Sequence, residues 1–294
     1  MKIGKLHLIA IIFIVGYYYS GVYNFQRDEN YKLMLDAARH MKIVSNKILE
    51  RKIEKGIEVD YGLDINKTGL IGHEYTEITT TLGNLESKRT STNPDFAALF
   101  VKILKERGLQ KGDKVAVNMS GSFPALNIAL IIALDLLELE GVIISSLGAS
   151  TYGANNPEFT YLDIEDFLLK EKLIFNHSKA YSLGGDGDLG ENFEEEYKEK
   201  ILERFRDGNR KFFHIAEYKK NIEERLKHYL SFGEIKTFIN IGGNLVSENL
   251  LKEFSDRGID TISFLNIKLI ALKYKIPLDP MPLPEIGKSK LYSN

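Results

Sequence analysis

Strand-like runs alternate with helical stretches along most of this chain, and that alternation constrains the fold more than any other feature. Five runs are rich in β-branched and aromatic residues, namely KVAVNMS, GVIISSL, KAYSLGG, TFINIGG and DTISFLN, which begin at positions 114, 141, 179, 237 and 260. Apolar residues at helical spacing predict helices at 123–139, 162–172, 191–206 and 247–257. This order predicts an α/β fold with a Rossmann-like, mainly parallel sheet and flanking helices.

Small polar residues follow four of these runs at the point where each run ends. The corners read SGS at 120–122, SSLGAS at 145–150, SLGGDGD at 182–188 and NIGGN at 240–244. Because ligands bind at the carboxyl ends of the strands in such sheets, we expect the corners to form a site on one edge. The alternative for each corner is a tight turn without a binding role. The residues assigned to the site here are Asn118, Gly121, Ser146, Gly148, Ser150, Gly184, Gly185, Asp186, Asn240, Gly242 and Gly243.

An anionic group is the ligand that these corners favour. Small residues let backbone N–H groups approach a ligand, and the N-terminus of each following helix adds a partial positive charge. The nucleotide-binding pattern GxGxxG is absent after the strands, as is GxxxxGK followed by Ser or Thr. The sequence therefore predicts a pocket for a carboxylate or phosphate group and no cofactor.

A second group of candidate ligand-binding residues lies in the segment 69–100. Lys88 and Arg89 stand beside three hydroxyl residues, so they could clamp an anion, with Arg89 binding it through two hydrogen bonds. The alternative is a solvated loop whose hydroxyls cap its own turns. A helix is expected to begin at Asn93-Pro94. The candidate residues of this segment are Thr80, Thr81, Lys88, Arg89, Thr90, Ser91 and Thr92.

The serines of the SGS corner, Ser120 and Ser122, are the candidate catalytic residues. A serine nucleophile needs a base within hydrogen-bond distance and an oxyanion hole. The sequence SGSFP is not the GxSxG pattern, and no histidine lies in an equivalent corner, so the base could be Lys88, Glu74 or Asp186. We expect the corner to bind an anion, and a serine-dependent amidohydrolase or transferase is the alternative.

The composition excludes several classes of function. A formal charge of −2 over 294 residues gives no basic field, so we predict no nucleic-acid partner. The chain has no cysteine, which removes disulfides and thiolate chemistry. The histidines form no HExxH pattern, and Asp186 and Asp188 lack EF-hand spacing. We therefore predict no metal site, and we interpret Asp188 as an N-cap or first-turn acid of the following helix.

The N-terminal segment has the composition of a membrane-spanning helix. Residues 6–23 contain no Asp, Glu, Lys or Arg, and a run of that length can cross a bilayer. Lys2 and Lys5 precede the run, so the positive-inside rule keeps the N-terminus in the cytoplasm and the main domain outside. We expect an uncleaved, single-pass anchor in the cytoplasmic membrane. A removed signal peptide and a buried globular helix are the alternatives.

These patterns divide the chain into three parts. Residues 1–26 form the membrane anchor, 27–56 an amphipathic helix and 57–294 the α/β domain. The helix within 27–56 could continue outward from the membrane as a stalk or pack on the domain. We expect it to pack, because its apolar residues recur at helical spacing and form one face.

Six long stretches after the N-terminal segment carry a family resemblance. They read GLIGHEYTEITTTLGNLESKRTSTNPDFAAL, VNMSGSFPALNIA, SSLGASTYGANNPEFTYLD, SLGGDGDLG, FINIGGN and FLNIKLIALKYKIPLDPMPLP. Together they resemble the poly-gamma-glutamate system protein family. The resemblance implies a membrane-linked accessory protein of the bacterial machinery that makes and exports poly-gamma-glutamate. It implies no catalytic mechanism and gives no role to any single residue.

From this resemblance we expect a membrane-anchored protein that acts in poly-gamma-glutamate biosynthesis, export or surface retention. Its expected partners are the membrane and the polymer or a γ-glutamyl oligomer, bound through a carboxylate. Two alternatives stay open. One is a serine-dependent enzyme that cuts or attaches the polymer, and the other is a structural partner of the polyglutamate synthase or exporter.

Overall fold

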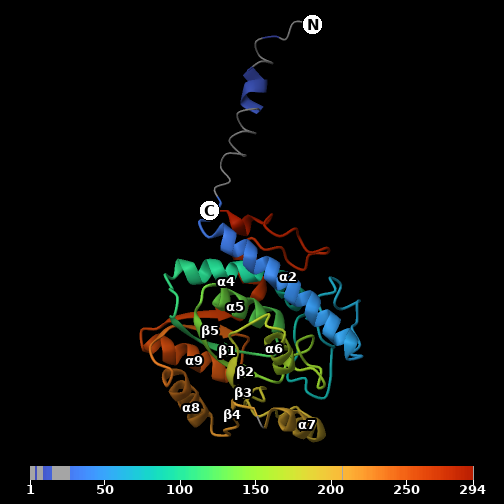
Figure 1. Cartoon of the computed structure of the whole chain (residues 1–294), viewed down its shortest axis with the longest axis vertical. Helices are drawn as coiled ribbons and strands as arrows, with labels where there is room; N and C mark the ends of the chain where they lie inside the picture. Colours follow the sequence, from blue (N-terminus) through green and yellow to red (C-terminus); the bar gives the residue numbers. More distant parts are fainter. Residues whose placement is uncertain (1–3, 5–8, 15–26, 207, 294) are drawn as a thin grey trace.

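Six parallel strands form the centre of the protein (Figure 1). The computed structural model describes residues 4, 9–14, 27–206 and 208–293. The spatial order is β4-β3-β2-β1-β5-β6, and every neighbouring pair is parallel. The predicted α/β fold is therefore confirmed. The strands are β1 (Lys114–Met119), β2 (Glu140–Ser146), β3 (Ser178–Ser182), β4 (Lys211–Phe213), β5 (Ile235–Ile241) and β6 (Asp260–Phe264).

Helices flank this sheet, and two buried apolar clusters lie between helices and strands. Successive strand residues point to opposite faces, so Val115 and Val117 belong to one cluster and Ala116 to the other. The helices are α2 (Tyr31–Glu54), α3 (Leu85–Ser91), α4 (Asp95–Glu106), α5 (Pro124–Leu136), α6 (Tyr161–Lys170), α7 (Glu195–Arg206), α8 (Tyr218–Leu230), α9 (Leu245–Asp256) and α10 (Ile267–Lys273). The first cluster includes residues of α2, α4 and α5, and the second includes residues of α8 and α9.

The amphipathic helix α2 packs on the domain. Met34, Met41 and Ile48 recur on one face of the helix and are completely buried. This face covers α4 and α5, and Figure 1 shows α2 lying across them. Because α2 and α4 both pack against it, α5 is apolar on nearly every side. The residues of α2 therefore belong to the larger hydrophobic core.

The beginning and the end of the described domain lie side by side. Arg27 and Ser293 form an isolated antiparallel bridge, and the backbone N–H of Asp28 donates to the carbonyl of Tyr292 at 3.0 Å. The Asp28 carboxylate also pairs with Lys102 of α4 at 2.5 Å. In Figure 1 the last segment of the chain, in red, runs beside α2, in blue. The two ends therefore leave the domain at one place.

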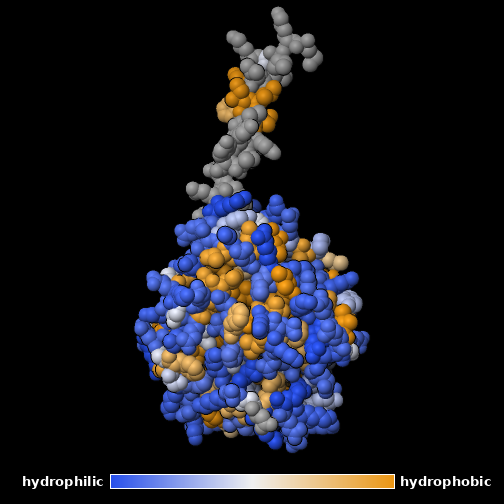
Figure 2. Space-filling model, in the orientation of Figure 1, coloured by the Kyte–Doolittle hydropathy of each residue, from blue (hydrophilic) through white to orange (hydrophobic). Residues whose placement is uncertain are grey.

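Most of the predicted membrane anchor, residues 1–26, lies outside the described residues. Residues 9–14 are helical, and their apolar side chains are exposed (Figure 2). Among the helices that the structure describes, none is both long and apolar enough to cross a membrane. The anchor therefore stays a prediction.

The order of the strands creates a crevice at the middle of the sheet. Strands β2, β3 and β4 follow β1 outward on one side, whereas β5 and β6 lie on the other side of β1. The direction of winding reverses between β1 and β5. In open α/β sheets such a switch point leaves a crevice beyond the carboxyl ends of the strands, where ligands bind.

Candidate functional site

A polar pocket opens at this switch point, beyond the carboxyl ends of β1, β2, β3 and β5. It encloses about 520 Å³, including its open mouth. Residues from all four predicted corners line it, so the structure brings together segments that are far apart in the sequence. The predicted residues that line the pocket are Thr80, Thr81, Asn118, Ser120, Ser122, Ser146, Gly148, Gly184, Gly185, Asp186, Gly242 and Gly243.

Hydrogen bonds between corners fix the SGS turn against the neighbouring strand end. Ser120 Oγ donates to Ser122 Oγ at 2.9 Å, and the N–H of Ser150 donates to the same Ser122 Oγ at 2.9 Å. The N–H of Gly121 donates to Ser146 Oγ at 3.2 Å. These bonds hold the hydroxyls of Ser120 and Ser122 at the pocket wall, while Gly121 and Ser150 lie behind it.

Two glycines allow this close approach for different reasons. A Cβ at Gly121 would lie 2.8 Å from the carbonyl oxygen of Gly148, so any side chain would push the two corners apart. Gly242 has φ of +97°, and a Cβ there would lie 2.6 Å from Cβ of Ser120. Only Gly242 therefore requires the left-handed backbone region that favours glycine. At Gly121 the requirement is space alone.

Lys88 lies immediately behind the pocket wall, with its side chain buried. Its Nζ donates to the carbonyl of Ser122 and, at 2.7 Å, to Ser150 Oγ. The amine also lies 4.1 Å from the ring centre of Phe123. Burial lowers the pKa of Lys88 to about 7. Among the described residues, no carboxylate forms an ion pair with it, so the charged form is compensated by dipoles alone.

Arg89 points away from the pocket, so the predicted clamp of Lys88 with Arg89 does not form. The Arg89 guanidinium donates to the carbonyls of Leu63 and Gly62, at 2.7 Å each, and lies 3.5 Å from Asp279. These contacts tie α3 to two other segments of the chain. Arg89 therefore has a structural role here.

The hydroxyls of Thr90, Ser91 and Thr92 do not reach the pocket either. They donate to the carbonyls of Glu86, Lys88 and Arg89, three or four residues earlier, and all three residues are buried. The solvated loop expected as the alternative is also wrong, because residues 85–91 form helix α3. Helix α4 begins at Asp95 with Pro94 as its N-cap, as expected.

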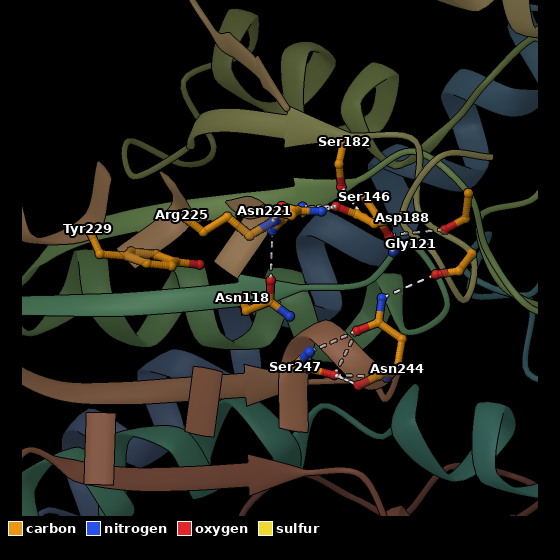
Figure 3. Close-up of polar contacts among 12 residues, drawn as sticks. Asn118, Gly121, Ser146, Ser182, Asp188, Asn221, Arg225, Tyr229, Asn244 and Ser247 are labelled. Carbon is orange, nitrogen blue, oxygen red and sulfur yellow. Dashed lines mark hydrogen bonds and ion pairs between the residues drawn. The ribbon is translucent and has the colours of Figure 1, made fainter. Parts of the chain in front are cut away.

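A buried ion pair between Asp188 and Arg225 forms one wall of the pocket (Figure 3). The Arg225 side chain extends from α8 and also donates from Nε to Asn221 Oδ1 at 3.0 Å and from Nη1 to Asn118 Oδ1 at 3.2 Å. Asp188 accepts further hydrogen bonds from Ser182 Oγ at 2.6 Å and from Asn221 Nδ2 at 3.1 Å. The two charges are thus neutralised by each other and by amide and hydroxyl groups.

This pairing corrects the interpretation of Asp188 as a helix cap. Helix α7 begins at Glu195, seven positions later, and Asp188 is buried with φ of +67°. Asp186 lies exposed on the pocket lining. Within the described part of the chain, no cluster of three metal-ligating side chains is present.

The N-terminus of α9 closes the pocket beside the β5 corner. Asn244 caps this helix by accepting from the N–H of Ser247 at 2.9 Å, and Ser247 Oγ accepts from the N–H of Asn244 at 2.8 Å. Asn244 Nδ2 also donates to the carbonyl of Gly185 at 3.2 Å, so the β3 and β5 corners are joined. The first amides of a helix lack intrahelical acceptors, and Val246 in the first turn lines the pocket. This end therefore offers hydrogen-bond donors and partial positive charge.

The sequence interpretation missed eight lining residues, of which Arg225 is the most informative. It lies on α8, whose buried positions include Ile222, Leu226 and Tyr229 as well as Asn221 and Arg225. A polar pair four residues apart on the apolar face of a helix was the available signal. The other missed lining residues are Met119, Ser182, Asp188, Ile241, Asn244, Val246 and Ser247. Asn240, which was assigned to the site, lies outside the lining and accepts from Asn118 Nδ2 at 2.9 Å.

No known protein-family model matches this chain, and no curated protein matches it. The resemblance to the poly-gamma-glutamate system protein family therefore stays a prediction from the sequence.

Proposed function

We propose that this protein is a membrane-anchored accessory protein of poly-gamma-glutamate biosynthesis, export or surface retention, and that its pocket binds a carboxylate-bearing group. The observation that carries the binding proposal is the composition of the pocket wall. Serine and threonine hydroxyls and glycine backbone line it beside the capped end of α9. Such groups bind an anion through several hydrogen bonds without a full positive charge.

The buried pair of Asp188 and Arg225 supports a ligand bound mainly by amides and hydroxyls. Because Arg225 already has three side-chain acceptors, it is not free to supply a bidentate contact in this arrangement. The Asp186 carboxylate on the lining opposes a second negative charge nearby. The pocket is therefore suited to one carboxylate with neutral groups around it.

A γ-linked glutamate chain has this chemistry, since its side-chain carboxyls form the amide links and each residue keeps a free α-carboxylate. The polymer and the membrane enter the proposal through the family resemblance and through the charge-free run at 6–23. The predicted topology places the pocket outside the cytoplasmic membrane, where exported polymer would be available.

Titration calorimetry of the purified full-length chain in detergent micelles tests the binding proposal. A γ-linked triglutamate should bind, whereas the same peptide with all of its carboxylates amidated should not. An α-linked triglutamate tests the linkage. If neither charged peptide binds, the pocket does not hold a carboxylate of this class.

One observation favours a second candidate, the serine-dependent amidohydrolase or transferase. Lys88, one of the three bases considered from the sequence, is a buried amine in contact with Ser150 Oγ, and burial lowers its pKa to about 7. The contact is with Ser150, which is absent from the lining, whereas Ser120 and Ser122 face the pocket. Binding is therefore our first choice. Shortening of the polymer by the purified protein, measured by gel filtration, would favour the enzyme.

The structural-partner alternative concerns the anchor and the helix in 27–56. Since α2 is buried along its inner face, only its outer face is free for a partner. Crosslinking from that outer face to the synthase or exporter, without any ligand in the pocket, would favour this alternative.

A further inference from the structure

Lys88 is a buried cation without a carboxylate partner, placed directly behind the pocket. It is 2% exposed, and its Nζ reaches the wall through the carbonyl of Ser122, a residue whose side chain lines the pocket. Ser150 Oγ and the Phe123 ring complete its surroundings. Burying an ammonium group without a counter-ion is unfavourable, so the site is incomplete when the pocket holds no anion.

The charged groups on the elements packed around Lys88 do not supply that counter-ion. On its own helix, Glu86 pairs with Lys268 of α10, and Arg89 binds carbonyls and Asp279. Residues 120–123 and 147–153, which include the two partners of Nζ, carry no carboxylate, and their one titratable side chain is the phenol of Tyr152. Helix α10, which packs against α3, carries the cations Lys268 and Lys273, and the charged groups on the pocket lining are Asp186 and the Asp188–Arg225 pair.

We propose that Lys88 is the positioning cation of this pocket: an anionic ligand bound at the serine corner supplies its missing counter-charge, and the amine takes up a proton as the ligand binds. The inference rests on the proposed function, because it needs a carboxylate in the pocket. The inference goes beyond that function by naming Lys88 as a determinant of affinity and by predicting that ligand binding is coupled to proton uptake. The ligand contacts the hydroxyls and amides of the wall. The Lys88 ammonium attracts the ligand electrostatically from behind the wall, without touching it.

The sign of the pH dependence follows from the state of Lys88 before binding. Burial holds the pKa of the free site at about 7, so around pH 8 most of the amine is neutral. A nearby anion favours the ammonium form and raises that pKa. Binding therefore weakens as pH rises above 7, with a dissociation constant about ten-fold larger at pH 8 than at pH 6. At pH 8 about one proton should be taken up for each ligand bound.

Calorimetry with γ-linked triglutamate measures both quantities on the full-length protein. Titrations at pH 8 in buffers of different ionisation enthalpy give the number of protons taken up. Titrations at pH 6 and pH 8 in one buffer give the ratio of dissociation constants. Wild-type protein is sufficient for both, so the inference is testable even if substitutions impair folding.

Lys88→Met removes the charge and keeps the length of the side chain. The variant should bind at both pH values with the weak affinity that wild type shows at high pH, and without proton uptake. Lys52→Met is the matched control, because Lys52 is also a buried lysine with a lowered pKa but lies outside this pocket. The control should keep the wild-type pH dependence.

The outcomes separate the two proposals. If the peptide binds with no proton uptake and equal affinity at both pH values, the role of Lys88 is wrong and the pocket proposal stands. If the charged peptide does not bind at either pH, the proposed function fails first. If Lys52→Met abolishes proton uptake and Lys88→Met does not, Lys52 is the residue that takes up the proton. That result would overturn the inference.

Discussion

Asp188 and Arg225 meet in the wall of the candidate pocket as a buried ion pair, although 37 positions separate them in the chain. Their side chains are 3% and 2% exposed. Asp188 comes from the loop after β3, and Arg225 from the inner face of α8. The pair therefore joins the corner after β3 to helix α8, which packs on one face of the sheet. We expect both the stability of the fold and the shape of the pocket to depend on it.

Removing one member of this pair should destabilise the protein strongly. Arg225→Met leaves the Asp188 carboxylate buried without a counter-ion, and such losses typically cost about 3–5 kcal/mol in the free energy of unfolding. The double variant with Asp188→Asn should recover part of that loss, because no charge then stays buried. Urea denaturation measures both, and Lys236→Met, which breaks an exposed pair with Glu234, is the control and should lose much less stability. Equal losses in the single variant and the control would show that the pair does not matter.

Arg89→Ala should reduce stability and leave ligand binding unchanged. The guanidinium donates to two backbone carbonyls, and losing hydrogen bonds to a charged group costs about 1.5–3 kcal/mol. The exposed Arg257, which is the C-cap of α9 and pairs with Glu253 of that helix, provides the control, and Arg257→Ala should change stability by about 0.5 kcal/mol or less. Denaturation and calorimetry on the same samples give both values. If Arg89→Ala instead weakens the affinity for the charged peptide and leaves stability unchanged, Arg89 is a ligand-binding residue.

Substitutions in the SGS corner distinguish a binding role from a catalytic role. Ser120→Ala and Ser122→Ala should each weaken binding by about 0.5–1.5 kcal/mol, the usual loss for one hydrogen bond. Gly242→Val should have a larger effect, because a Cβ there meets Ser120 and a β-branched residue disfavours the positive φ. Calorimetry measures the affinities. Labelling by a fluorophosphonate probe that disappears in one alanine variant would identify a nucleophile and contradict a purely binding role.

Because of Lys52, the free energy of unfolding should increase with pH above about pH 8. Burial lowers the pKa of Lys52 to about 8 in the folded protein. Between pH 8 and the ordinary lysine value, the unfolded chain binds more protons than the folded one, so the free energy of unfolding increases with pH. Lys52→Met should remove this share of the increase. Urea denaturation between pH 8 and 9.5 tests it, and the exposed Lys105→Met should keep the wild-type slope.

The predicted topology can be tested on cells. Lys2 and Lys5 predict a cytoplasmic N-terminus, so the domain should lie outside the membrane. Protease added to intact spheroplasts should digest it. Digestion that requires lysis would reverse the orientation, and release of the domain without detergent would instead favour a cleaved signal peptide.

The strands and their polar corners were predictable because each run carries its own local signal. Val115 to Val117 are β-branched or small and are followed by the Ser120-Gly121 corner. Residues 237–241 are mostly β-branched or aromatic and are followed by Gly242-Gly243. Strand β4 was missed because Lys211–Phe213 is shorter than any repeat that periodicity can detect. Helix α8 lies between β4 and β5, so without β4 it was not recognised as the connection between two strands. Its buried residues do recur at helical spacing.

The contacts between distant segments could not be predicted from one sequence. Lys88 and Arg89 are adjacent in the chain, but the helical turn sends one side chain behind the pocket and the other towards Leu63. The hydroxyl run that follows looked like a loop, since Ser and Thr favour turns when they stay solvated. In α3 those hydroxyls bond to carbonyls of the preceding turn instead, which lets them be buried.

The joined chain ends have a mechanical consequence. Any tension that reaches the domain through its N-terminal segment acts first on Arg27 and Asp28, which are held by the bridge to Ser293, the carbonyl of Tyr292 and the ammonium of Lys102. Tyr292 passes the load to Asp95 through its hydroxyl, at 2.6 Å, and so to the start of α4. Force would therefore be shared among three segments before α2 is pulled from its neighbours, and the sheet edge that carries the pocket would be shielded from the strain.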